Sequence, residues 1–246
     1  MSIHTSALVT GGTSGIGRAA AEKLATLGLH VVVTGRNTER GDAVVAGIRE
    51  RGGRADFVAA DLHDAASAAA VATEAQRLAG GRIDVLVNNA GVFPFGPTEA
   101  TTEADFDSVY SLNVKAPYFL VAALAPAMAE RGTGAIVNVT TMVAEFGADG
   151  MGLYGSTKAA LVLLTKSWAA EFGTKGVRVN AVSPGPTRTE GTAAMGEGLD
   201  ALAAQGPAGR PGTPEEVADA IVFLATDASS FVHGAVLPVD GGRIAV

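Results

Sequence analysis

Short apolar runs rich in valine, isoleucine and alanine alternate along the chain with longer alanine-rich segments of helical character. The short runs show no polar alternation, which is typical of strands buried on both faces of a parallel sheet. Their alternation with helical segments predicts right-handed crossovers between parallel strands. The predicted strands are Ala7–Thr10, His30–Thr34, Ala55–Ala59, Ile83–Val87, Ala135–Thr140, Val177–Val182 and Val236–Val239.

The longer segments predict helices between these strands. We expect the longest, Glu103–Arg131, to bend or break near Asn113–Pro117. The last begins with Thr213-Pro-Glu-Glu216, a threonine N-cap, a proline at the first helical position and a glutamate that closes a capping box. The other predicted helices are Gly15–Leu27, Thr38–Arg51, Ala65–Ala79, Leu153–Phe172 and Pro214–Thr226.

Together these elements predict a Rossmann-type, doubly wound α/β fold: a seven-stranded parallel sheet with helices on both faces, in a single domain spanning residues 1–246. A chain of 246 residues with 32 glycines and only 17% charged residues suits a sheet buried on both faces.

The glycine- and proline-rich segment Gly185–Gly212 directly follows a strand end. We expect it to form a substrate lid within the domain.

Composition and charge exclude several classes of site and partner. The chain has no cysteine, and its four histidines are scattered, so we expect no metal site and no thiolate chemistry. A net charge of −7 argues against binding to nucleic acid or to an anionic membrane. The longest uncharged helical run, Ala116–Ala129, is too short to span a bilayer, and we recognise no signal peptide. We therefore expect a cytoplasmic protein.

Tyr154 and Lys158 lie four residues apart in a predicted helix, so their side chains share one face. A phenol beside an ammonium group can transfer a proton. We expect the positive charge of Lys158 to lower the pKa of Tyr154 from about 10 toward neutrality. Such pairs also occur by chance, so this pair alone does not establish a catalytic site.

A glycine-rich turn follows the first predicted strand, in Thr10-Gly-Gly-Thr-Ser-Gly-Ile-Gly17. Glycines let the backbone turn tightly and approach a pyrophosphate, which binds at the N-terminus of the next helix. A tight strand-to-helix connection would show similar glycines. The strand before the turn and the helix after it favour a dinucleotide site.

The end of the second predicted strand carries Gly35 and Arg36, where NAD-binding sites usually have an acidic residue for the ribose 2′-hydroxyl. A guanidinium can bind a 2′-phosphate with charge-assisted hydrogen bonds of about 1.5–3 kcal/mol. The sequence therefore favours NADP(H), with NAD(H) also possible if Arg36 is a solvated loop residue. Ser14 supplies no second positive charge in the glycine turn.

With these motifs in place, the chain resembles the short-chain dehydrogenase/reductase family in its single-domain form. The resemblance spans essentially the whole chain. It is carried by the glycine turn, the pair at residues 154 and 158, and further motifs in the same order: Asp61-Leu62, Asn88-Asn-Ala-Gly91, Asn113, Pro184-Gly185 and Val239-Asp-Gly-Gly242.

The resemblance implies roles for individual residues. Tyr154 would be the catalytic acid or base, and Lys158 would bind the nicotinamide ribose. Asn113 would hold, through its backbone carbonyl, a water that links Lys158 to solvent. Asp61 would accept from the adenine amino group, and Thr187 and Thr189 are candidates for contact with the carboxamide. The expected cofactor-binding residues are Gly11, Thr13, Ser14, Gly15, Ile16, Gly17, Arg36, Asn37, Asp61, Leu62, Asn88, Ala90, Gly91, Tyr154, Lys158, Pro184, Gly185, Thr187 and Thr189.

One position departs from the family pattern. The family normally has a serine thirteen residues before the tyrosine, and this chain has Thr141. Threonine keeps a hydroxyl that can donate and accept, although its methyl group stiffens the side chain and takes space. We expect Thr141 to hold the substrate oxygen in a narrower pocket, with Asn113, Thr141, Tyr154 and Lys158 as the catalytic set. In the alternative, Thr141 only packs and Thr140 supplies the hydroxyl.

These assignments predict reversible hydride transfer between NADP(H) and a ketone or secondary alcohol of apolar character. The expected pocket walls are apolar, and the only charged candidates are Glu145, Asp149 and Arg188. The expected walls are Phe93, Phe95, Met142, Val143, Phe146, Met151, Leu153 and Met195.

Two other functions remain open. One is a 3-oxoacyl-[acyl-carrier-protein] reductase. Alanine in Trp168-Ala-Ala-Glu171, where such members often carry arginine, weakens this alternative, although we expect Arg131 to lie nearby. The other is a dinucleotide sensor without catalysis, which the retained Tyr154 and Lys158 disfavour. By resemblance we expect a homotetramer, or a dimer, through the alanine-rich faces of Ala116–Ala129 and Ala159–Ala170.

Overall fold

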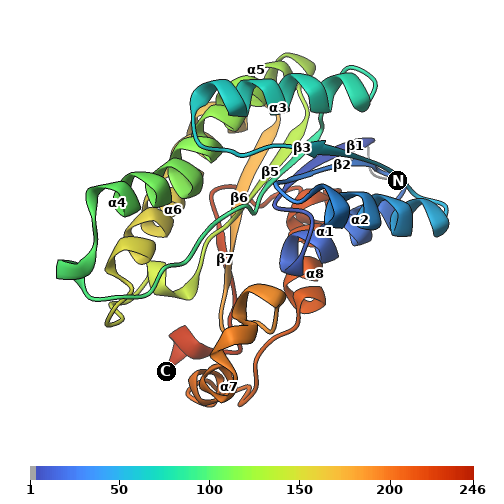
Figure 1. Ribbon diagram of the computed structural model, residues 1–246. Helices are drawn as coiled ribbons and strands as arrows, with labels where there is room; N and C mark the ends of the chain where they lie inside the picture. The colour runs from blue at the N-terminus through green and yellow to red at the C-terminus, as the bar shows by residue number, and fades with distance from the viewer. Residues whose placement is uncertain (1–3) are drawn as a thin grey trace.

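The computed structural model describes residues 4–246, and a seven-stranded sheet forms its centre (Figure 1). Neighbouring strands are parallel, in the order β3-β2-β1-β4-β5-β6-β7. The strand order reverses between β1 and β4, and ligands of such sheets bind beyond the carboxyl ends of the strands at that point. The strands are β1 (Ser6–Thr10), β2 (His30–Gly35), β3 (Arg54–Ala59), β4 (Val85–Asn88), β5 (Gly134–Val139), β6 (Val177–Pro184) and β7 (Val236–Val239).

Helices cover both faces of the sheet and enclose two apolar cores (Figure 1). One face packs on α1 (Gly15–Thr26), α2 (Thr38–Glu50) and α8 (Pro214–Ala225). The other packs on α3 (Ala65–Leu78), α5 (Ala116–Arg131) and α6 (Gly152–Phe172). Adjacent strand residues alternate between the cores.

In β1, for example, Val9 belongs to the first core and Leu8 to the second. Leu8 and Leu120 are fully buried in that second core, and burial of such a side chain contributes about 1.5–3 kcal/mol. The predicted fold class, a doubly wound seven-stranded parallel sheet, is confirmed. Both faces are covered, as the absence of polar alternation indicated.

The long helical segment predicted at Glu103–Arg131 is interrupted, as expected. α4 (Glu103–Tyr110) ends in a π-helical turn, Ser111–Lys115, before α5 begins. The whole stretch is long and apolar enough, by length and composition, to cross a membrane. However, part of it packs in the core, since Leu124 and Met128 are buried against the sheet and α3.

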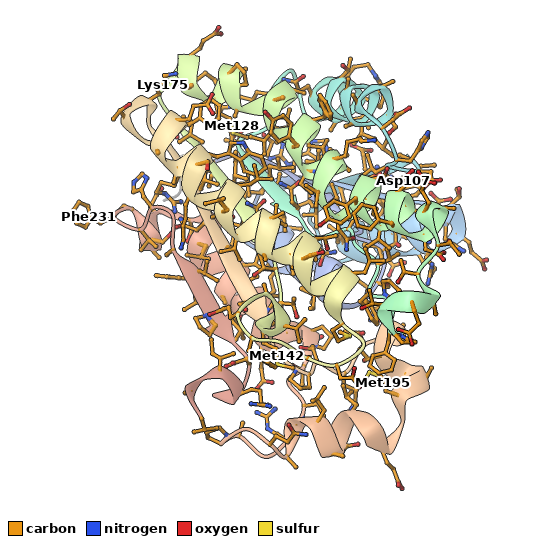
Figure 2. The ribbon with its side chains drawn as sticks, turned by 90° about the vertical axis from the view of Figure 1, so that its left-hand side faces the viewer. Asp107, Met128, Met142, Lys175, Met195 and Phe231 are labelled. Atoms are coloured by element: carbon orange, nitrogen blue, oxygen red, sulfur yellow. The ribbon has the colours of Figure 1, made fainter. Side chains whose placement is uncertain are left out.

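The segment after β6 crosses the carboxyl ends of the strands. It contains a 3-10 helix, Glu190–Met195, and the short helix α7 (Glu197–Ala203). Figure 2 shows Met142 and Met195 at this end of the molecule, whereas Phe231, which is 99% exposed, projects from another part of the surface. The chain ends beside the segment, in a 3-10 turn at Arg243–Ala245.

Candidate active site

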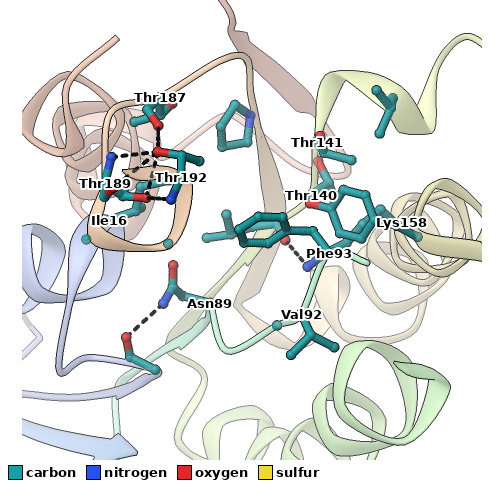
Figure 3. A pocket seen from close by; sticks show the side chains of 18 of the residues that line it. Ile16, Asn89, Val92, Phe93, Thr140, Thr141, Lys158, Thr187, Thr189 and Thr192 are labelled. Atoms are coloured by element: carbon teal, nitrogen blue, oxygen red, sulfur yellow. Dashed lines mark hydrogen bonds between the residues drawn. The ribbon is translucent and has the colours of Figure 1, made fainter. Parts of the chain in front are cut away.

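A cavity of about 760 Å³ lies at the carboxyl ends of the strands and brings most of the predicted site residues together (Figure 3). It extends from the glycine turn after β1 to the segment after β6. Predicted residues that line it are Gly11, Thr13, Ser14, Gly15, Ile16, Arg36, Asp61, Leu62, Ala90, Gly91, Thr141, Tyr154, Lys158, Pro184, Gly185, Thr187 and Thr189.

The glycine turn is shaped by close backbone approach. Gly11 and Gly15 have positive φ angles of 62° and 50°, which favour glycine. A Cβ atom on Gly17 would lie 2.3 Å from the carbonyl oxygen of Gly11, so a side chain cannot fit there. Gly17, in the first turn of α1, therefore lets the helix pack closely on the backbone of the glycine turn, although Gly17 does not line the cavity. Asn89 supports the same turn, because its side-chain nitrogen donates to the carbonyls of Thr10 and Gly11 at 2.9 and 3.1 Å.

The N-terminus of α1 already binds an anionic group. The backbone N–H of Gly15 donates to a carboxylate oxygen of Glu190 at 2.9 Å, and Arg18 forms an ion pair with the other oxygen at 3.1 Å. Hydrogen bonds from the backbone and the charge of Arg18 lower the pKa of Glu190. Helix N-termini favour anions through free N–H groups and the helix dipole. Glu190 therefore shows that this helix end can bind an acidic group such as a pyrophosphate.

Two arginines lie at the far side of this cofactor end. Arg36 follows β2, and Arg40, one turn into α2, also lines the cavity. Arg40 was not predicted, although it lies in the first turn of the predicted helix that follows Arg36. Asn37, predicted to bind cofactor, instead caps α2 by accepting from the backbone N–H of Arg40 at 2.8 Å.

Lys158, Tyr154 and Thr141 meet where the cavity passes β5. α6 places Tyr154 and Lys158 one turn apart, as predicted. The Lys158 ammonium group is buried and donates to the carbonyl of Val139 at 2.8 Å. Tyr154 is hydrogen-bonded to the Thr141 side chain. The Thr140 hydroxyl instead donates to the carbonyl of Val182 at 2.8 Å, so Thr141 supplies the hydroxyl nearest the phenol.

The expected effect of Lys158 on the phenol is not found. Burial raises the pKa of Tyr154 to about 12, opposed only in part by the hydrogen bond with Thr141. Burial also lowers the pKa of Lys158 to about 8. The prediction of a near-neutral tyrosine is therefore wrong for the protein by itself, because burial disfavours the charged phenolate. At neutral pH Tyr154 carries its proton, and Lys158 is mainly charged.

Asn113 lies behind the cavity wall. Its side-chain oxygen accepts from the backbone N–H of Val92 at 3.0 Å, and its nitrogen donates to the Val92 carbonyl at 2.8 Å and to the Thr157 hydroxyl at 3.1 Å. The π-helical turn directs this fully buried amide toward the loop after β4. Asn113 thus fastens that loop to α6, and its predicted water contact through the backbone carbonyl stays a prediction.

Asn88, another predicted cofactor residue, is also outside the cavity lining. Its side chain is buried and donates to the Asn138 side chain at 2.9 Å, which joins β4 to β5. Its neighbour Asn89 lines the cavity. Successive side chains at a strand end point in opposite directions. The motif at residues 88–91 was therefore placed correctly, but the asparagine that lines the cavity is Asn89 and not the predicted Asn88.

The substrate end of the cavity is mainly apolar. Phe93 packs edge-on against Tyr154, with ring centroids 6.2 Å apart. The expected walls that line the cavity are Phe93, Phe95, Met142, Val143, Phe146, Met151 and Met195, whereas Leu153 is absent from this lining. Of the charged candidates, Asp149 lines the cavity, Arg188 forms an ion pair with Asp200 at 2.6 Å, and Glu145 accepts from the Ser183 hydroxyl at 3.2 Å.

The segment after β6 is ordered by its own threonines (Figure 3). Thr187 donates to the Gly185 carbonyl at 3.0 Å, and Thr192 donates to the Thr187 carbonyl at 2.8 Å. Thr189 caps the following 3-10 helix by accepting from the Thr192 N–H. All three line the cavity, so the predicted pair Thr187 and Thr189 faces the site together with Thr192.

Arg131 does not lie at the mouth of the cavity. Its guanidinium donates to the Ile83 carbonyl at 2.9 Å and lies 3.7 Å from the Asp84 carboxylate, at the amino ends of the strands. The cavity is at the carboxyl ends. Arg131 therefore supplies no basic contact for an acidic carrier at this site, contrary to what its position in the sequence suggested.

The residues present fit a nicotinamide dinucleotide. The helix end that holds Glu190 binds an anion, and the glycine turn lines the cavity at this helix end. A Cβ atom on Gly91 would lie 3.2 Å from the Asn113 amide oxygen and 3.3 Å from the Lys158 ammonium, so glycine keeps the space beside Lys158 open. The cavity thus offers a continuous path from the phosphate-binding turn to Tyr154.

Comparison with known proteins agrees with this geometry. A family model described as Enoyl-(Acyl carrier protein) reductase matches residues 11–243. Gluconate 5-dehydrogenase from Gluconobacter oxydans is 41% identical over 241 residues, covering 96% of this chain and 93% of that protein.

Two solved structures have nearly the same fold. One, a short chain dehydrogenase/reductase family protein, is 48% identical with a TM-score of 0.92 and full coverage of both chains. The other, from Beutenbergia cavernae with NADP bound at low occupancy, is 41% identical with a TM-score of 0.93, covering 100% of this chain and 99% of that chain. With the glycine turn, the Tyr154–Lys158 pair and the parallel sheet, these matches show that the chain belongs to the short-chain dehydrogenase/reductase family of oxidoreductases.

Proposed function

We propose that the protein transfers a hydride reversibly between NADP(H) and a ketone or secondary alcohol. One observation carries this proposal: the Thr141, Tyr154 and Lys158 side chains line the same cavity as the glycine turn and Arg36. The bound nicotinamide would supply or accept the hydride. The residues of the chain would hold the substrate oxygen and move its proton.

Tyr154 is the proton donor in the reducing direction. Its pKa of about 12 keeps the phenol protonated at neutral pH, so it can donate to a carbonyl oxygen that gains negative charge. Thr141 provides a second hydrogen bond to that oxygen. Lys158, held by the Val139 carbonyl, would bind the ribose hydroxyls and place a positive charge near the phenolate left after proton transfer.

The preference for NADP(H) rests on two positive charges at the 2′-phosphate position. Arg36 and Arg40 both line the cavity at the carboxyl end of β2, and no acidic residue follows this strand directly. Two guanidinium groups favour a phosphate over a hydroxyl by charge-assisted hydrogen bonds. The NADP bound to the relative from Beutenbergia cavernae supports this preference.

A homotetramer is part of the proposal. Exposed aromatic and aliphatic side chains gather on α4, α5 and α6, including Phe106, Tyr118 and Leu163. Contiguous exposed apolar surface of this kind favours association. Light scattering of the purified protein measures the mass directly, and a monomer at micromolar concentration would refute the assembly.

A substrate panel tests the activity. Purified protein is incubated with NADPH or NADH and a set of ketones, and cofactor absorbance is followed over time. We expect turnover with NADPH, and slower turnover with NADH. NADPH binding without turnover of any ketone, or of any secondary alcohol with NADP⁺, would contradict the proposal and favour a sensor.

A further inference from the structure

Arg243 brings a positive charge to the substrate end of the cavity from a distant part of the chain. It begins the 3-10 turn after β7 and lines the cavity together with Phe146, Leu202 and Gln205. Its guanidinium lies over the Phe146 ring, 5.1 Å from the centroid, and its Nη2 atom donates to the Gln205 side-chain oxygen at 3.0 Å. These two contacts orient the guanidinium between the loop after β5 and the end of α7.

The positive charge of Arg243 has no acidic partner among residues 4–246. No ion pair joins it to a carboxylate, and its buried Nε atom has no hydrogen-bond acceptor. Most other arginines form ion pairs, as Arg188 does with Asp200. Arg54 and Arg178 also form no ion pair among the described residues, but they donate to backbone carbonyl groups outside the cavity lining. Arg36 and Arg40, at the cofactor end, are the other cavity-lining arginines for which the described residues supply no ion pair. An oriented guanidinium that lines a cavity and has no carboxylate partner can bind an anionic group there.

Other charged groups near this end do not satisfy Arg243. Asp149 lines the cavity but is exposed and forms no recorded ion pair with Arg243. Asp240, three residues before Arg243, accepts from the backbone N–H groups of Gly242 and Ile244 at 2.9 and 2.8 Å. Glu145 accepts from Ser183. Each neighbouring carboxylate is therefore either solvated or committed elsewhere.

We propose that Arg243 binds a carboxylate of the substrate, so that the protein acts on oxo acids or hydroxy acids with an apolar middle section. This inference rests on the proposed function, because Tyr154 and Thr141 must hold the reacting oxygen. The phenyl and methionine walls between them would contact the carbon chain. A guanidinium suits a carboxylate, because its planar set of N–H donors forms charge-assisted hydrogen bonds with carboxylate oxygens.

Oxo acids and their methyl esters provide the test, since each pair differs only in charge and a methyl group. A series of graded chain length is used with NADPH, together with cyclohexanone as a neutral ketone. The enzymes compared are the unchanged protein, Arg243→Met, Arg243→Lys and Arg188→Met. Methionine keeps an apolar stem over Phe146, and Arg188 is a matched arginine outside the cavity lining.

We expect the unchanged protein to prefer the best oxo acid over its ester by at least about tenfold in kcat/KM, the scale of a charge-assisted hydrogen bond. Arg243→Met should abolish this preference, mainly through KM, while its activity on cyclohexanone and on the ester is kept. Arg243→Lys should keep part of the preference, and Arg188→Met all of it.

Two results separate failure of this inference from failure of the proposed function. Equal kcat/KM for acids and esters in the unchanged protein, or an unchanged preference in Arg243→Met, would overturn the role of Arg243 and leave hydride transfer intact. NADPH binding with no reduction of acids, esters or cyclohexanone would overturn both.

Discussion

The two ends of the cavity are built in different ways. The cofactor end is made mainly of backbone: the glycine turn at residues 11–17, the strand end at Arg36 and the N-terminus of α1. The substrate end is made of side chains from the loops after β4 and β5, the segment after β6 and the C-terminal turn. The residues of the first end follow four strands, and each group forms a local motif at a strand end, whereas the second end forms only where four separated segments meet.

Charge also separates the two ends. The cofactor end already holds an anion, because Glu190 accepts from Gly15 N–H and pairs with Arg18. The substrate end presents Arg243 without a carboxylate partner among residues 4–246. An anion at the N-terminus of α1 must therefore compete with Glu190, whereas an anion at Arg243 would meet a positive charge with no competing carboxylate among residues 4–246.

Tyr154→Phe tests whether turnover can be lost while cofactor binding is kept. We expect kcat to fall by about 10²–10⁴-fold, because a positioned general acid is lost. NADPH binding, measured by cofactor fluorescence, should be unchanged because the glycine turn and Arg36 remain. Full activity in this variant would refute the assignment of Tyr154.

Arg36→Ala probes the cofactor end. NADPH affinity should fall by about tenfold to a hundredfold, the equivalent of losing charge-assisted bonds to the 2′-phosphate. NADH affinity should stay the same, since that cofactor has no such phosphate. Arg40→Ala should act in the same direction. Equal losses for both cofactors would instead indicate a structural role for Arg36.

Thr141→Ala probes the junction with the substrate end. We expect kcat/KM for ketone reduction to fall at least about tenfold, because one hydrogen bond to the charged oxygen is removed. Thr141→Ser should cost little, since it keeps the hydroxyl and removes only the methyl group. Equal activity of all three proteins would show that Thr141 only packs.

Glu190→Gln has the smallest expected effect on NADPH affinity. It tests whether the Glu190 carboxylate competes with the cofactor at the N-terminus of α1. Glutamine keeps an oxygen for the Gly15 N–H but removes the charge, so NADPH should bind a few-fold more tightly. The effect is small because exposed ion pairs such as Arg18–Glu190 contribute about 0.2–1 kcal/mol. Glu197→Gln, in α7, is the matched control. Weaker NADPH binding in Glu190→Gln would show that Glu190 supports the cofactor site.

Much of the fold and the cofactor end could be predicted because the signals are local. Strand runs, the glycine turn and the spacing of Tyr154 from Lys158 depend on residues within a few positions of each other, and the structure contains each of them. The break at Asn113 was also expected, although the role of its side chain in holding Val92 was not. That role depends on a contact between separate loops, which spacing does not encode.

Three features of the site required the folded chain. Asn89 rather than Asn88 faces the cavity, because strand direction decides which neighbour points inward. Tyr154 has a raised pKa, because burial outweighs the hydrogen bond with Thr141. Glu190 reaches Gly15 from 175 positions away in sequence, so no local motif could reveal the contact.

By itself, then, the sequence determined the parallel sheet, the phosphate-binding turn and the proton-transfer pair, since backbone conformation and helical spacing follow from neighbouring residues. Only the tertiary structure decided which charges face the cavity and which are neutralised. Arg131 lies near Asp84 at the amino ends of the strands, and Arg188 forms an ion pair with Asp200 outside the cavity lining. Arg243, in contrast, lines the cavity over the ring of Phe146. Ion pairing and burial depend on distances between remote segments, and those distances exist only after the sheet and its helices have packed together.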